Sequence, residues 1–144
     1  MIVVSACLCG IACRYDAAAF ADGELSRLVR EGRAIPVCPE CLGGLPTPRT
    51  PCEICGGDGD DVLEGRALVM DKNGQDQTAA FIKGAQYTLQ AALSVGANQA
   101  ILKARSPSCG CGCIYDGSFS GILRKGNGVT AALLLRNGIQ VTQR

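Results

Sequence analysis

Three cysteines of this 144-residue chain each follow a short apolar run. Cys7 follows IVVSA, Cys38 follows AIPV, and Cys109 lies a few residues beyond AIL. Short aliphatic runs bounded by Gly, Pro or Ser predict buried strands. In an open α/β sheet, ligands bind beyond the carboxyl ends of the strands. Parallel strands lying side by side would therefore bring the three thiols together.

The cysteines favour a soft metal centre. The chain contains ten cysteines and no histidine, so neither imidazole ligand nor imidazole base is present. Thiolates without imidazole suit an iron–sulfur cluster, which is the first candidate. Two CxxC pairs, Cys38 with Cys41 and Cys52 with Cys55, leave two alternatives open. One is a zinc-stabilised binding domain with a tetrahedral site, and the other is a thiol-based sulfur carrier or redox protein.

Strands and helices alternate along the chain. The sequence predicts strands at residues 1–6, 34–37, 100–103 and 139–142, a strand pair at 62–63 and 67–70, and helices at 24–31, 77–95 and 129–136. Segments 38–59 and 105–121 are rich in Gly, Pro, Ser and Cys, and we expect ordered loops there. The alternation predicts a single Rossmann-like α/β domain over residues 1–144, with a mainly parallel sheet and helices on both faces.

Composition excludes several classes of function. The net charge of +1 argues against binding bulk nucleic acid or a membrane surface. No apolar run approaches the roughly 18–20 residues of a membrane span. The start of the chain lacks the basic leader and cleavage site of a signal peptide, so we expect a cytoplasmic protein. In that compartment, many cysteines indicate metal or redox chemistry rather than disulfides.

Seven motifs occur in order along nearly the whole chain: VSACLCGIACRYD, PVCPECLGGLPTPR, GGDGDDVL, AILKARSPSCG, IYDGSFSG, GNGVTAALL and GIQV. In these motifs the sequence resembles the thiouracil desulfidase family, formerly domain of unknown function 523. The resemblance implies a [4Fe–4S] cluster held by three cysteines, which match Cys7, Cys38 and Cys109 here. It also implies two catalytic side chains, which match Glu40 and Ser106.

The reaction implied by the resemblance removes sulfur from thiolated pyrimidines, such as 2- or 4-thiouracil or thiouridine, and releases sulfide. Such bases occur in tRNA, so thiolated nucleosides and RNA pieces also fit as substrates. Three thiolate ligands leave one iron open to a soft thiocarbonyl sulfur. We expect Glu40 to be a base or proton shuttle and Ser106 to bind the ring or the attacking water. We expect Lys103 and Arg105 to neutralise an anionic intermediate or to contact a phosphate.

The remaining cysteines are not assigned by the resemblance. At five positions the chain departs from the family pattern, because it has a cysteine where the family usually has another residue: Cys41, Cys52, Cys55, Cys111 and Cys113. Cysteine often behaves as a small buried hydrophobe, and we interpret Cys13 in this way. For Cys9 the sequence favours neither packing nor chemistry.

Overall fold

Four parallel strands form the main sheet, in the order β2-β1-β5-β8. The computed structural model describes residues 1–18 and 20–144. The four strands are β1 (Ile2–Ser5), β2 (Ala34–Val37), β5 (Gln99–Leu102) and β8 (Gln140–Gln143). The α/β fold with a mainly parallel sheet is thus confirmed, and each of these strands lies within one or two residues of its predicted position.

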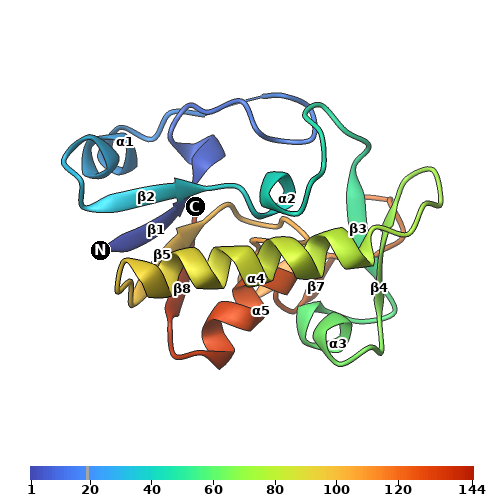
Figure 1. Ribbon diagram of the computed structural model, residues 1–144. Coiled ribbons are helices and arrows are strands. Elements are labelled where there is room, and N and C mark those ends of the chain that lie inside the picture. The colour runs from blue at the N-terminus through green and yellow to red at the C-terminus, as the bar shows by residue number, and fades with distance from the viewer. Residues whose placement is uncertain (19) are drawn as a thin grey trace.

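Helices cover both faces of this sheet, as predicted (Figure 1). They are α1 (Gly23–Arg30), α4 (Thr78–Ser94) and α5 (Val129–Arg136). Neighbouring residues of β1 point to opposite faces: Val3 packs in the core formed with α4 and α5, and Val4 packs with α1. Within the described residues, no helix is both long and apolar enough to cross a membrane.

Two small antiparallel sheets extend the molecule beyond one end of the main sheet (Figure 1). They consist of β3 (Cys52–Cys55) with β4 (Leu68–Asp71), and β6 (Cys113–Tyr115) with β7 (Leu123–Lys125). Their apolar side chains form a separate core with one end of α4, in which Ile54, Phe81 and Ile114 are fully buried. These small sheets supply the far wall of the site described below.

The structure corrects three sequence-based expectations. Segment 38–59 is not an irregular loop, because it contains helix α2 (Pro39–Leu42) and strand β3. The predicted loop 105–121 likewise contains β6. Residues 62–63 are not a strand but part of helix α3 (Gly59–Leu63), because Asp58 and Asp61 form a capping box that starts a helix there. The strand β4 pairs with β3 instead.

Helix α2 lies in close contact with α4 through two glycines. A Cβ atom on Gly84 would lie 1.9 Å from the carbonyl oxygen of Pro39, and one on Gly43 would lie 2.1 Å from that of Ala80. Only glycine allows this approach of the two backbones. Since Pro39 stands between Cys38 and Glu40, the contact with α4 fixes the backbone that carries both side chains.

Replacing Gly84 with alanine should therefore lower stability. Overpacking costs about 1–3 kcal/mol, which exceeds the roughly 1 kcal/mol that alanine gains over glycine in a helix. We expect G84A to lower the melting temperature by several degrees, measured by circular dichroism. The matched control is G23A, at the start of α1, where nothing lies within 4 Å of the added Cβ. Equal melting temperatures for the two variants would contradict the close approach.

Candidate active site

The main sheet has a topological switch point beside β1. The chain passes from β1 to β2 on one side of β1 and then returns to β5 on the other side. Ligands of open α/β sheets bind at such points, outside the carboxyl ends of the strands. A cavity of about 420 Å³ lies at this position, which is within the usual range for ligand pockets. Its lining includes Ser5, Val37 and Lys103 at the ends of the main-sheet strands, and Cys52 and Tyr115 of the two small sheets.

The structure brings Cys7, Cys38 and Cys109 to the wall of this one cavity. Cys7 lies in a single 3-10 turn, η1 (Ala6–Leu8), directly after β1. Cys38 directly follows β2 and occupies the position before the first residue of α2. Cys109 lies in the loop after β5. The three thiols therefore come from three adjacent parallel strands.

Ser106 organises the turn that carries Cys109. Its hydroxyl oxygen accepts the backbone N–H groups of Ser108 at 3.1 Å and of Cys109 at 3.0 Å. The Ser108 carbonyl in turn accepts N–H groups from the first turn of α5. The Ser108 hydroxyl forms a hydrogen bond with the Thr130 hydroxyl at 2.7 Å. Since two acceptor bonds occupy the Ser106 oxygen, its O–H proton stays available for donation. Ser106 also lines the cavity.

Glu40 reaches the cavity from the first turn of α2. Its side chain is 18% exposed, and its Oε2 lies 3.3 Å from Nη2 of Arg49, which is 4% exposed. Burial raises the pKa of the Glu40 carboxyl, and the Arg49 charge opposes that shift. A carboxylate that binds protons more tightly than usual is suited to proton transfer near neutral pH.

A fourth thiol, that of Cys13, joins the predicted three. The Cys13 thiol hydrogen-bonds with those of Cys7 and Cys38, and this contact lowers the pKa of both neighbours while raising that of Cys13. Burial raises the pKa of Cys109 to about 12. Cys13 is buried, as its interpretation as a packing residue requires, but it also lines the cavity. The packing interpretation was therefore incomplete.

The tetrahedral zinc alternative does not fit the geometry. Cys52 and Cys55 are three positions apart on β3, so their side chains point to opposite faces of the strand. Cys52 faces the cavity, whereas the Cys55 thiol donates to the carbonyl of Gly117 at 3.5 Å. No three Cys, Asp or Glu residues of the described chain are placed to hold a single metal ion. A four-iron cluster differs in that each thiolate binds a separate iron.

The other cysteines lie outside the described lining of the cavity: Cys9, Cys41, Cys55, Cys111 and Cys113. The Cys111 thiol donates to the carbonyl of Val141 at 3.6 Å, at the far edge of the sheet. The Cys41 thiol donates to the carbonyl of Cys13 at 3.7 Å. The two CxxC motifs therefore differ: the thiols of Cys38 and Cys41 contact each other beside the Cys13 carbonyl, whereas those of Cys52 and Cys55 lie apart.

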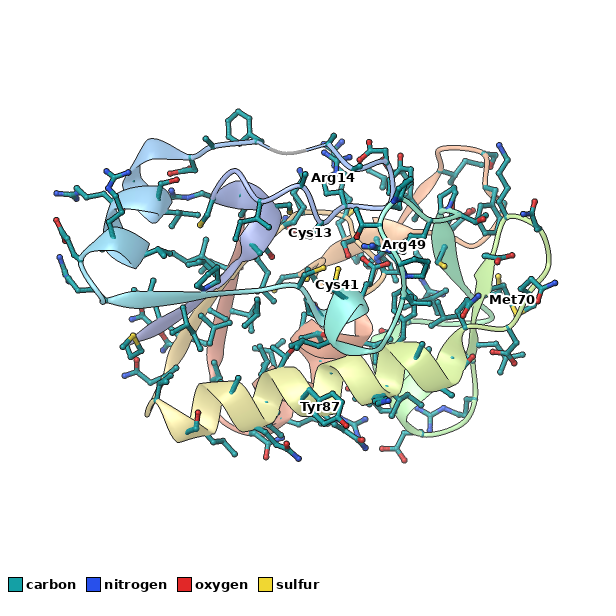
Figure 2. The ribbon with its side chains drawn as sticks, turned by 45° about the horizontal axis from the view of Figure 1, so that its top comes forward. Cys13, Arg14, Cys41, Arg49, Met70 and Tyr87 are labelled. Carbon is teal, nitrogen blue, oxygen red and sulfur yellow. The ribbon has the colours of Figure 1, made fainter. Side chains whose placement is uncertain are left out.

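Arg49 is a site residue to which the sequence analysis assigned no role. Its Nη2 donates to the carbonyl of Cys13 at 2.9 Å, and its backbone N–H donates to that of Tyr15 at 2.6 Å. Figure 2 shows Arg49 and Cys41 gathered around Cys13. The available signal was a cationic residue inside the proline-rich motif PTPR, but its partners lie on loops distant in sequence.

Comparisons with known proteins agree on one family. The profile of the 2-thiouracil desulfurase family matches residues 2–144. The uncharacterized protein YbbK of Bacillus subtilis (strain 168) is 50% identical over 141 residues, which cover 98% of this chain and 93% of YbbK. A solved structure, the [4Fe–4S]-dependent thiouracil desulfidase TudS, is 45% identical with a TM-score of 0.87, and the match covers 99% of this chain and 89% of that one.

Ser5 joins two of the strands that form the site, and its removal should be costly. Its buried hydroxyl accepts the backbone N–H of Lys103 at 2.9 Å. S5A should destabilise the protein by about 1–3 kcal/mol, because that N–H loses its partner. The control is S26A, since the buried Ser26 hydroxyl has no partner among the described residues. Thermal unfolding should show S26A equal to or more stable than the parent protein, and equal losses in both variants would contradict the linking role.

Proposed function

Because the chain belongs to the 2-thiouracil desulfurase family, we propose that it is a [4Fe–4S]-dependent thiouracil desulfidase whose cluster is held by Cys7, Cys38 and Cys109. The observation that carries the ligand assignment is the position of these thiols on one cavity, at the carboxyl ends of adjacent parallel strands. In the reaction, thiouracil and water give uracil and hydrogen sulfide, with no net oxidation or reduction.

The residues of the cavity fit such a cofactor. Cysteine thiolates are its usual ligands, and the chain has no histidine to act as a nitrogen ligand. Arg14 and Lys103 favour the thiolate of Cys7, and Arg49 favours that of Cys38. When bound by three thiolates, the cluster supplies one iron without a protein ligand, a soft Lewis acid that polarises a thiocarbonyl group.

Two side chains accept or donate protons in the proposed reaction. Glu40 accepts a proton from the water that attacks the ring carbon bearing sulfur, because its carboxylate faces the cavity two residues from Cys38. The Ser106 oxygen already accepts two N–H groups, so its hydroxyl donates to the ring or to the water. Both roles are supported by the presence of these groups in the lining of the same cavity.

The cavity lining favours a small planar substrate. Tyr115, Phe119 and Pro107 offer apolar surface to a pyrimidine ring. Lys103 and Arg105 also line the cavity and form no ion pair with a described residue. They are therefore available to an anionic ring or to the phosphate of a thiolated nucleotide or RNA piece. The substrate is a thiolated pyrimidine, as a base or a nucleoside.

Two wider assignments complete the proposal. Residues 1–144 act as one catalytic domain, because the elements that form the cavity extend from β1 to the loops beyond β5. The ten free cysteines suit a reducing compartment such as the cytoplasm. There the enzyme acts on thiolated pyrimidines, including those that derive from tRNA.

The ligand assignment predicts which cysteines the cluster needs. C7S, C38S and C109S should lose iron, acid-labile sulfide and sulfide release from 2-thiouracil, whereas C52S and C55S should keep all three. C13S should also keep the cluster, since Cys13 is not among the proposed ligands. The measurement is iron and sulfide per chain after anaerobic reconstitution, with about four of each expected in the parent protein. Loss of the cluster in C13S and its retention in C7S would overturn the assignment.

The base assignment predicts a loss of turnover without loss of cofactor. E40Q should lower kcat by about 10²–10⁴-fold, the usual contribution of a general base, while iron content stays at the parent level. The control is E31Q, because Glu31 lies at the exposed end of α1 and pairs only with Arg33 among the described residues. If E40Q retains full turnover with its cluster intact, Glu40 is not the base.

A further inference from the structure

Arg49 is a charged residue that lies almost completely buried in a proline-rich loop. Its side chain is 4% exposed. Its Nη1 donates to the carbonyl of Pro46 at 3.0 Å and to the Thr47 hydroxyl at 3.1 Å, while its Nε–H has no partner among the described residues. Burying a guanidinium is costly unless it is paired and hydrogen-bonded. The loop before β3 is therefore folded around this group.

Glu40 is the ion-pair partner of Arg49. The two groups lie 3.3 Å apart from Nη2 to Oε2, and no other cation of the described chain lies within ion-pair distance of Glu40. The Glu40 side chain is 18% exposed, and the ion pair with the buried guanidinium is its main polar contact among the described residues. Arg49 therefore determines the direction of the Glu40 side chain.

The same guanidinium joins the loop after β1 to the turn after β2. Its Nη2 donates to the carbonyl of Cys13 at 2.9 Å. That carbonyl oxygen also accepts the thiol of Cys38 at 3.6 Å, and the backbone N–H of Arg49 donates to the carbonyl of Tyr15. One buried guanidinium thus contacts the loop that carries Cys7, through the Cys13 carbonyl, and the helix that follows Cys38, through the Glu40 carboxylate.

We propose that Arg49 is a positioning residue of the desulfidase reaction, which holds the Glu40 carboxylate at the cavity in the direction needed for proton transfer. The proposal rests on the proposed function, because Glu40 moves a proton only in that reaction. Arg49 acts through Glu40 rather than on the substrate. Its loss should therefore affect kcat more than KM, since a misplaced catalytic group costs up to about 10²-fold in rate.

A double-mutant cycle tests this coupling. R49Q should lower kcat by about 10- to 100-fold and change KM by less than about threefold. In an E40Q background, R49Q should cause no further loss of kcat, because the carboxylate that Arg49 positions is already absent. R49K keeps the charge without the planar guanidinium and should recover part of kcat. The control is R33Q, since Arg33 is 65% exposed and pairs only with Glu31 among the described residues.

Two further readouts do not depend on turnover. Iron and sulfide content should stay at the parent level in R49Q and R49K. Amide hydrogen exchange in R49Q should speed up at residues 13–15 and 38–42, where the Arg49 contacts lie, and should stay unchanged in α5. Unchanged exchange at both segments would contradict the joining role.

The outcomes that overturn the proposal differ from one another. An equal loss of kcat in the parent and E40Q backgrounds would mean that Arg49 acts independently of Glu40. Loss of the cluster in both R49Q and R49K, while E40Q retains it, would mean that Arg49 serves the ligand loops instead. A parent enzyme with a full cluster but no sulfide release would overturn the proposed function, and the role of Arg49 would fail with it.

Discussion

The parallel pairing of β1 with β2 and β5 is the constraint on which the site depends. The register places Ser5 opposite Val37, so the residues that follow these two strands emerge at the same edge of the sheet. A slip of one residue would turn every side chain of a strand to the other face and would move Val3 and Val4 into the wrong cores. The buried faces thus specify the register, and the register brings the cysteine loops together.

The site concentrates groups that are unfavourable to bury. Five thiols, a carboxylate and a guanidinium line one cavity, where each must be paired or bound to stay charged. The structure offsets this through backbone carbonyls, of which that of Cys13 is shared by the guanidinium and by the thiols of Cys38 and Cys41. Separate apolar cores under the main sheet and under the small sheets supply stability away from the chemistry.

Sequence reasoning could predict the parts of the fold that have a clear period. Short aliphatic runs predicted the strands of the main sheet, and the helical repeat around Phe81 predicted α4. The four-residue elements α2 and β3 were missed, because Cys, Pro and Gly mask their pattern and tertiary packing stabilises them. The glycine contact between α2 and α4 has no local signature. For the same reason, the role of Arg49 and the place of Cys13 beside Cys7 emerge only when the loops close.

The most direct test of the cluster site is an anaerobic crystal structure of the reconstituted protein with anomalous data at the iron edge. Four iron positions beyond the carboxyl ends of β1, β2 and β5, bonded to the sulfurs of Cys7, Cys38 and Cys109 with Cys13 unbound, are the predicted result. A single metal ion elsewhere, or iron bonded to Cys13 in place of one of the three, would contradict it.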